Sequence, residues 1–361
     1  MPALRLLAGP KAFRVLNDQG FNPNVFSQLL AASGGPKWLG IAGLDKYLFG
    51  EFFNNLNRPL YTLGASSGAW RIACLAQQQP LEAYKRLEQF YIGQRYDTVP
   101  KPYEVSEQVR GVVAGILGET GRSDILNHPH IHSHFVVCRG KHLNRLPGRL
   151  PLAAGLALTA GCNLISRKSL PWHFERVVFS RQPHKEQVSR STHAASPFLQ
   201  LTDMPSEQAT LSTKNVEDVL LATGSIPMVL APVTHIHGVK PGHYYDGGIT
   251  DYHFDLPLAH AEGLTLYPHF FPQMSPGWFD KSLSWRNAKA HYDNALVLVP
   301  SAEFVASLPF GKIPDRDDFK RLDTATRMAY WREAASRSEC LGAELDQLIH
   351  SGDWQTRLER L

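Results

Sequence analysis

The chain has 361 residues, of which 43% are hydrophobic, so a sizeable core can form and global disorder is not expected. Its net charge is +4 and no run of like charges forms a basic tail, which argues against a nucleic-acid-binding protein. The four cysteines are scattered without a C-x-x-C pair, so neither a zinc site nor a disulfide scaffold is indicated.

No long apolar segment is present in the sequence. The first ten residues lack the apolar centre of a signal peptide, so we expect a reduced, cytoplasmic protein. No stretch reaches the roughly 20 apolar residues that a transmembrane helix needs. The nearest spans 150–165 and is followed by Arg167 and Lys168. We expect a buried helix of small residues there; the alternative is an apolar cap that touches lipid or acyl chains.

Two successive units of strand, glycine-rich turn and helix open the main part of the chain, after a lead-in expected over residues 1–24. Repeated units of this kind predict a parallel sheet in an α/β fold. The predicted strands are 25–31 and 58–63, the turns 33–37 and 64–68, and the helices 38–49 and 69–76.

The later elements are predicted from apolar periodicity and turn residues. Helices are expected at 81–94, 103–117 and 215–222, a short turn around Asp124, strands at 135–138, 174–179, 264–267 and 295–299, and a long polar loop at 181–209. From residue 317 the pattern predicts two charged helices broken near Ser351-Gly352. We therefore expect one catalytic domain over 25–300 and a helical C-terminal region over 301–361.

The stretch Gly64-Ala65-Ser66-Ser67-Gly68 carries the strongest chemical signal. It matches the G-x-S-x-G pattern and lies between a predicted strand and a predicted helix. In this context the glycines allow a sharp turn that exposes the central hydroxyl at the end of a sheet. The pattern predicts Ser66 as a nucleophile.

A serine nucleophile also needs donors for the oxyanion that develops during acyl transfer. The turn Ser33-Gly34-Gly35-Pro36-Lys37 supplies backbone amides at a helix start, although Pro36 has no N–H to donate. We predict that the amides of Gly34, Gly35 and Ser67 form this site.

The base that activates Ser66 has two candidate sources. A hydrolase triad would use Asp or Glu and then a histidine after the serine, but none of the later histidines lies in a recognisable local signature. The other source is Asp246-Gly247-Gly248, where a partly buried carboxylate could act directly as the base. A simple Asp-Gly turn is the alternative for that tripeptide. The histidines that remain candidates are His253, His260, His269, His291 and His350.

Together these motifs resemble the patatin-like phospholipases. That family has a glycine-rich oxyanion loop with a basic residue, then G-x-S-x-G, then a distant D-G-G or D-G-A. Here 33–37, 64–68 and 246–248 stand in that order. The stretch over 222–233, which begins Ala222-Thr223-Gly224-Ser225-Ile226-Pro227, is similar to a further family stretch that precedes the D-G-G. The resemblance covers about residues 25–270.

The resemblance implies a three-layer α/β sandwich with a mostly parallel central sheet. It also implies a Ser66–Asp246 dyad without histidine, with Gly34, Gly35, Lys37 and Ser67 as oxyanion or substrate-binding residues. The implied activity is hydrolysis of a lipid acyl ester, with no cofactor. The sequence departs from the family in its oxyanion loop, which has two of three glycines and no final glycine.

Two other functions stay open at this stage. One is a non-lipid carboxylesterase with a Ser–Asp/Glu–His triad. The other is a weakly active protein on the same fold that binds a membrane or a partner, for which the incomplete oxyanion loop is the argument. Peripheral contact with a membrane surface is an expectation shared with the lipid-hydrolase interpretation, since the C-terminal helices carry several arginines.

Histidines alternate in His128-Pro129-His130-Ile131-His132-Ser133-His134 and would share one face of a strand. No carboxylate completes a metal-binding set nearby, so we expect a polar strand entry and no metal. The pair His235 and His237 is expected in a turn.

Overall fold

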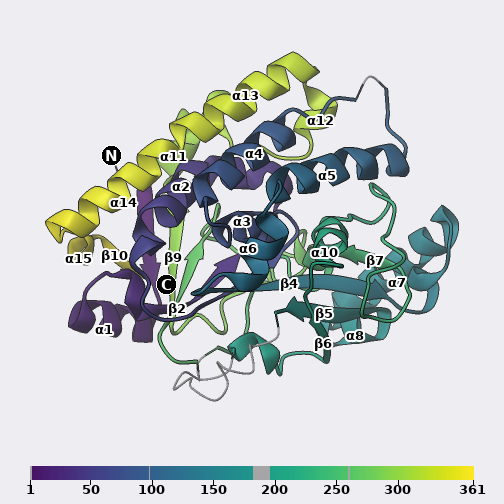
Figure 1. The fold of residues 1–361 in the computed structure, drawn as a ribbon, viewed down its shortest axis with the longest axis horizontal. Coiled ribbons are helices and arrows are strands. Elements are labelled where there is room, and N and C mark those ends of the chain that lie inside the picture. Colours follow the sequence, from purple (N-terminus) through teal and green to yellow (C-terminus); the bar gives the residue numbers. More distant parts are fainter. Residues whose placement is uncertain (1, 97, 182–195, 259–260) are drawn as a thin grey trace.

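The computed structural model describes residues 2–96, 98–181, 196–258 and 261–361. A ten-stranded, mostly parallel sheet runs through the molecule and helices flank it (Figure 1). The strand order is β10-β1-β9-β8-β2-β3-β4-β5-β6, and β7 pairs with β4. This confirms the predicted α/β fold with a mostly parallel central sheet and a helical C-terminal region.

The strands are β1 (Leu4–Ala8), β2 (Phe26–Ala31), β3 (Leu60–Ala65), β4 (Ile131–Gly140), β5 (Phe174–Ser180), β6 (Ser206–Thr210), β7 (Tyr244–Asp246), β8 (Leu264–Pro268), β9 (Ala295–Pro300) and β10 (Leu358–Arg360). The α-helices are α1 (Pro10–Gln19), α2 (Ala42–Gly50), α3 (Ser67–Leu75), α4 (Pro80–Ile92), α5 (Pro102–Leu117), α6 (Gly121–Asn127), α7 (Arg149–Ile165), α8 (Leu170–His173), α10 (Val216–Thr223), α11 (Ala302–Ser307), α12 (Asp318–Arg321), α13 (Thr324–Arg337), α14 (Glu339–Ser351) and α15 (Trp354–Arg357). None of these helices is long and apolar enough to cross a membrane.

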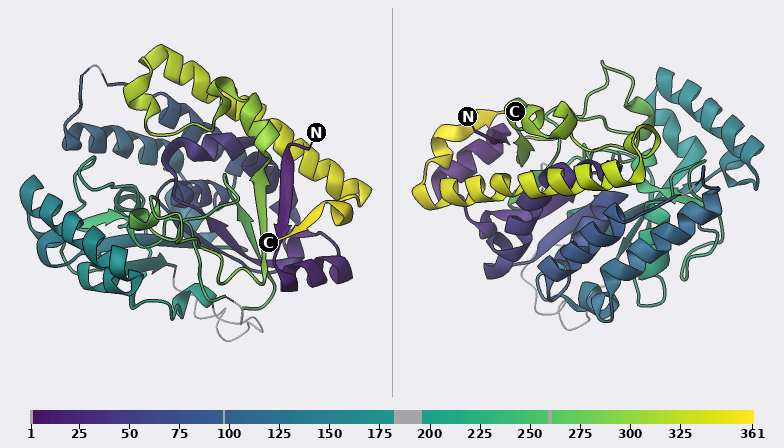
Figure 2. Two further views of the ribbon diagram at one scale, coloured as in Figure 1. Left: turned by 180° about the vertical axis from the view of Figure 1, so that it is seen from behind. Right: turned by 90° about the horizontal axis from the view of Figure 1, so that it is seen from above.

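The first strand of the chain differs from the predicted lead-in. β1 lies inside the sheet, antiparallel to β9 and parallel to β10, and four of its five residues are buried. The strands nearest the two ends of the chain are therefore neighbours, as Figure 2 shows from two sides. A five-residue apolar run gives too little periodicity to distinguish a strand from an irregular lead-in.

Three later predictions also need correction. Asp124 lies in the helix α6 and not in a turn. The amides of residues 123 and 124 donate to the carbonyl of Thr120, and Thr120 Oγ1 donates to the carboxylate of Asp124, which together close the first helical turn. The predicted polar loop over 181–209 contains the strand β6, and its residues 182–195 lie outside the described residues. The prediction of a buried helix at 150–165 is wrong: α7 forms, but most of its apolar side chains face solvent.

A buried ion pair ties α3 to the helices around it. Arg71 of α3 contacts both carboxylate oxygens of Asp45 in α2, at 2.5 and 2.7 Å, and Tyr84 of α4 donates a hydrogen bond of 2.7 Å to the same carboxylate. Arg71 and Asp45 are fully buried. Since α3 begins directly after Ser66, this packing fixes the helix that follows the candidate nucleophile.

Candidate active site

Strand β4 brings Ser66 and Asp246 together. β3 runs parallel to β4 and its last pair joins Ala65 to Val136; β7 runs antiparallel to β4 and pairs Asp246 with Val137. β5 occupies the other edge of β4, so β3 and β7 share one edge and point toward each other. Two residues that are 180 positions apart in sequence therefore meet at the carboxyl end of β3.

The turn at Ser66 has the strained geometry of a nucleophile elbow. Ser66 has φ 54° and ψ −132°, a backbone conformation that costs a residue with a side chain of the order of 1–3 kcal/mol. A Cβ at Gly64 would lie 2.7 Å from Ala69, and one at Gly68 would lie 1.9 Å from the carbonyl oxygen of Ala31. Both glycines are required because α3 starts in direct contact with β2 and β3.

Ser66 and Asp246 form a direct hydrogen bond. Ser66 Oγ donates to Asp246 Oδ2 at 2.7 Å, while Asp246 Oδ1 accepts the amide of Gly248 at 2.7 Å. Both side chains are buried. Burial raises the pKa of Asp246, and the charge of Arg316 together with the bonds from Ser66 and Gly248 partly opposes this. A carboxylate in this setting can accept the serine proton without a histidine.

The stretch 222–227 supports both members of the pair. Thr223 Oγ1 accepts the amide of Ser66 at 2.9 Å and donates to the carbonyl of Val136 at 2.6 Å. The amide of Asp246 donates to the carbonyl of Ser225 at 2.8 Å. The C-terminal end of α10 therefore joins the serine turn, β4 and the D-G-G turn through buried hydrogen bonds.

The glycine-rich loop lies beside the pair. A Cβ at Gly248 would lie 2.7 Å from Ser33 Oγ, which places this loop against the D-G-G turn. Within the described parts of the chain, the amides of Gly34, Gly35 and Ser67 have no hydrogen-bond acceptor. These three amides, predicted as oxyanion donors, are thus available for a ligand. Their catalytic role stays a prediction.

Two cations near the pair were not found by sequence reasoning. A Cβ at Gly35 would lie 2.8 Å from Arg316 Nε, so Arg316 covers the glycine-rich loop. Lys281 Nζ lies 3.9 Å from the ring centre of Tyr252. Desolvation of this amine, together with the charges of Arg316 and Lys37, lowers the pKa of Lys281. The residue as a whole is nevertheless exposed. Burial likewise lowers the pKa of Lys37, which is half-buried. The charges of Arg316 and Lys281 thus act on the Asp246 carboxylate, and Lys37 lies close enough to act on Lys281.

The cavity at Asp246 is small and largely apolar. It measures about 10 Å³, which is about the space one water molecule needs. Any ligand larger than a water molecule must therefore lie mostly outside it. Its lining comprises Ser33, Ile226, Pro227, Asp246, Gly248, Ile249, Tyr252, Trp278 and Arg316.

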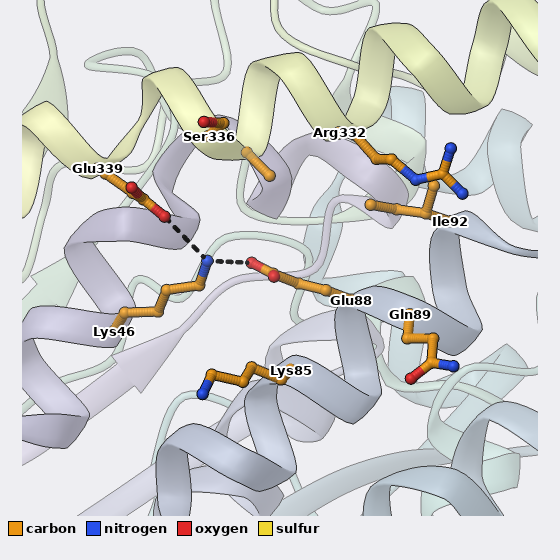
Figure 3. A pocket seen from close by; sticks show the side chains of 9 residues that line it. Lys46, Lys85, Glu88, Gln89, Ile92, Arg332, Ser336 and Glu339 are labelled. Carbon is orange, nitrogen blue, oxygen red and sulfur yellow. Dashed lines mark ion pairs between the residues drawn. The ribbon is translucent and has the colours of Figure 1, made fainter.

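A larger hollow of about 370 Å³ lies between α2, α4, α13 and α14 (Figure 3). There Lys46 Nζ stands 2.9 Å from a carboxylate oxygen of Glu88 and 3.5 Å from one of Glu339. It shares no lining residue with the cavity at Asp246. We assign it no role in the chemistry of Ser66.

The candidate histidines of a triad are engaged elsewhere. His253 accepts the amide of Ser275 through Nδ1, and burial lowers the pKa of His253 and of His269, to about 3 for His269. His291 pairs with Asp255 at 3.0 Å and His350 with Asp346 at 3.1 Å. Among the residues the structure describes, no histidine hydrogen-bonds Ser66; His260 lies outside them.

The alternating histidines His128 and His134 form hydrogen bonds to nearby backbone groups and to a serine hydroxyl. His128 Nδ1 accepts the amides of residues 130 and 131, and His134 contacts the carbonyl of Thr62 at 3.0 Å and Ser196 Oγ at 2.8 Å. Over the described ranges, no group of three or more His, Cys, Asp or Glu side chains could hold a metal ion. His235 and His237 are exposed, beside a turn at Gly238.

Comparisons with known proteins give little support. No family model matches the chain, and neither does any curated protein. Among solved structures, VipD from Legionella pneumophila is weakly similar, with a TM-score of 0.31 and 15% identity. The match covers 67% of this chain and 50% of that chain, so it spans only half of VipD's length.

Proposed function

We propose that the protein is a serine acyl hydrolase of the patatin-like type, acting on a lipid ester through a Ser66–Asp246 dyad. The observation that carries this proposal is the 2.7 Å hydrogen bond from Ser66 Oγ to Asp246 Oδ2, at a serine with positive φ in a strand–turn–helix. A structural serine has no need for that backbone strain or for a buried carboxylate partner.

In the first step, Asp246 takes the Ser66 proton as Oγ attacks the acyl carbonyl carbon. The amides of Gly34, Gly35 and Ser67 stabilise the oxyanion, and the proton then passes from Asp246 to the leaving alcohol as the ester C–O bond breaks. In the second step, Asp246 takes a proton from water, whose oxygen attacks the acyl-serine. Collapse releases the carboxylic acid and returns the proton to Ser66 Oγ.

The surroundings of the dyad favour an acyl ester with a nearby negative charge. The side chains of Ile226, Ile249 and Trp278 offer apolar contact for the acyl group. Arg316 lines the same cavity, and no carboxylate within the described ranges forms an ion pair with it. An anionic group next to the scissile ester, as in a phospholipid, would supply the missing counter-charge.

A fluorophosphonate probe tests the nucleophile directly. We expect mass spectrometry to find the phosphonyl group on Ser66 and no labelling of Ser66→Ala. Asp246→Asn should retain the fold and lower esterase kcat by roughly 100- to 10,000-fold, the usual range for a general base. Comparable activity in Asp246→Asn and the unmodified protein would overturn the dyad.

The same Asp246→Asn variant has a second expected property. Because burial raises the pKa of Asp246, its ionised form destabilises the fold, and this penalty is absent below the pKa of the unfolded chain and develops as pH rises through the folded-state pKa. Asn should therefore be as stable as Asp, or more stable, at neutral pH, and any advantage should vanish in acid. Thermal melts across pH check this and show that lost activity is not lost folding.

The triad alternative makes the opposite prediction for the histidines. If His253, His269 or His291 were the base, its replacement by Gln would abolish activity in a protein that still melts cooperatively. The dyad predicts activity within a few-fold of the unmodified protein for His291→Gln, which is partly exposed and lies against Asp255.

A further inference from the structure

Helix α7 buries its Thr159 and Asn163 side chains and leaves most of its apolar side chains exposed. Thr159 Oγ1 accepts from Asn144 Nδ2 at 3.3 Å, and Asn163 Nδ2 donates to Asp280 Oδ1 at 2.7 Å, so the polar side is bonded to the body of the protein. This reverses the pattern of a surface helix. The exposed side consists of Leu150, Ala153, Ala154, Ala157, Leu158, Ala160, Gly161, Leu164 and Ile165, with Leu150 84% and Ile165 87% exposed.

Cations stand at both ends of this apolar side. Arg145 and Arg149 precede it and Lys168 follows it, all three exposed and without an ion-pair partner within the described ranges. The stretch 125–174 contains no Asp or Glu. The helix therefore presents an uncharged apolar strip with a positive rim.

Two exposed tryptophans lie near the C-terminal end of α7. Trp172, in α8, and Trp285 are each 68% exposed. Arg286, next to Trp285, donates to the carbonyls of Asn163 and Leu164. Tryptophan, apolar side chains and lysine or arginine are the residues that place a helix at the boundary between lipid headgroups and acyl chains.

The apolar contacts of α7 lead to the cavity at Asp246. Leu152 and Leu156 of α7 pack in one cluster with Ile249 and Trp278, which line that cavity. The helix itself lies at the periphery of the molecule, away from α13 and α14 (Figures 1 and 2). A lipid held at α7 would therefore lie close to this cavity, which is itself too small for an acyl chain.

We propose that the exposed side of α7, with its basic rim and the two tryptophans, is the surface by which the protein binds an anionic lipid bilayer. The positive rim meets the anionic headgroups while the leucines and isoleucine enter the acyl boundary. The surface then holds the cavity at Asp246 against the layer that contains the ester. This deepens the acyl-hydrolase proposal, and the two can fail separately.

Vesicle sedimentation of the Ser66→Ala protein tests the surface without hydrolysis. We expect binding to phosphatidylcholine vesicles that contain phosphatidylglycerol and much weaker binding to phosphatidylcholine alone. Arg149→Gln with Lys168→Gln should weaken binding roughly 10- to 30-fold, since each basic residue near an anionic surface contributes about fivefold. Lys214→Gln with Lys320→Gln, which removes two exposed lysines elsewhere, is the matched control.

A second pair of variants tests the apolar strip, one inside α7 and one control outside it. Leu158→Glu should weaken vesicle binding about tenfold or more, whereas Val99→Glu, at a 94% exposed position outside α7, should not. If Leu158→Glu does not melt cooperatively, Leu164→Ser replaces it in the binding test. All α7 variants should keep their activity on a short, water-soluble ester, which tests the dyad alone.

Three results would overturn the proposal: no binding to anionic vesicles, equal loss in the α7 and control variants, or a stable dimer in light scattering that Leu158→Glu dissociates. The last would assign the strip to a second copy of the chain. Vesicle binding with no activity on any ester would instead overturn the hydrolase proposal and leave the surface standing.

Discussion

At the scale of single residues, the electrostatic balance around Asp246 decides when it can act as a base. Burial raises the pKa of this carboxyl, while the positive charge of Arg316 lowers it. The proposed dyad requires the base form of Asp246 for attack by Ser66, so we expect activity to fall as pH drops through the pKa of Asp246. If Asp246 is the base, as we propose, Arg316 extends the pH range of activity toward lower pH.

Arg316→Gln should move the acidic limb of the kcat/KM profile to higher pH, because the charge that favours ionised Asp246 is gone. At its plateau, kcat/KM for an anionic ester should fall about tenfold or more, with a smaller loss for a neutral ester, since a charge-assisted contact is removed. Profiles of both esters against pH measure the two effects. Lys320→Gln, an exposed change in the adjacent helix α12, should leave the limb in place; an unmoved limb in Arg316→Gln would contradict the assignment.

Sequence reasoning found Ser66 and Asp246 because each lies in a local signature that backbone geometry requires. Gly247, for example, would place a Cβ 2.2 Å from the carbonyl oxygen of Val136, so only glycine fits where β7 leaves β4. Arg316 has no such signature. It lies 250 positions after Ser66 (316 minus 66) and reaches the site through packing of the C-terminal region, which a local pattern does not encode.

At the scale of elements, the hydroxyl of Thr223 links α10, β4 and the serine turn. It accepts from Ser66 N–H and donates to the Val136 carbonyl, and it is fully buried. The resemblance pointed to the stretch that contains Thr223. That its hydroxyl links three elements is seen only from its hydrogen bonds to Ser66 and Val136. The strained φ of Ser66 persists because such contacts hold it.

Thr223→Val keeps the shape of the side chain and removes its hydroxyl. Two buried backbone groups then lose their partner, so we expect a loss of about 1–3 kcal/mol in the free energy of unfolding. The turn should also relax, lowering kcat about tenfold with little change in KM. Thr223→Ser retains the hydroxyl and should restore both. Denaturant titration and steady-state kinetics make the comparison, and equal behaviour of the Val and Ser variants would refute the connector role.

Helix α7 shows where composition misleads. The run of Leu, Ala and Gly over 150–165 suggests burial, but Thr159 and Asn163 on its inner side bond to polar groups of distant elements, beside the buried Leu152. Apolar residues then remain outside. The side of α7 that packs on the rest of the protein is set by Asn144, Asp280 and Arg286, whose positions near the helix are seen only in the structure.

At the scale of the whole molecule, the region after Pro300 is continuous with the rest of the fold. α14 packs on α2, where a Cβ at Gly43 would lie 2.2 Å from Glu339, and Trp331 of α13 is fully buried. β10 extends the sheet beside β1. The helical character after residue 317 and the break near Ser351 were predicted, whereas α11 and the boundary between α13 and α14 at Ser338 were not. The strand β10 was also not predicted, because three residues near the end of the chain carry no usable pattern.

Two truncations separate the contributions of this region. A chain that ends at Arg357 loses β10, with three backbone pairs to β1 and the Arg5–Glu359 ion pair. The ion pair is well exposed and adds little. The lost backbone hydrogen bonds and side-chain packing should lower the free energy of unfolding by about 2–4 kcal/mol, and the bared edge of β1 should increase aggregation. Esterase activity should remain, since Ser66, Asp246 and Arg316 are all retained.

A chain that ends at Pro300 should behave differently. It loses Arg316 and exposes the faces of α2 and β1 that α13, α14 and β10 cover, which removes several fully buried side chains, among them Trp331, Leu341 and Leu345. Each large core side chain is worth about 2–5 kcal/mol, so the deficit exceeds the 5–15 kcal/mol stability of an ordinary domain once a few are lost. We expect no cooperative melt and no fluorophosphonate labelling. A folded, labelled chain ending at Pro300 would instead show that residues 25–300 form an independent catalytic domain.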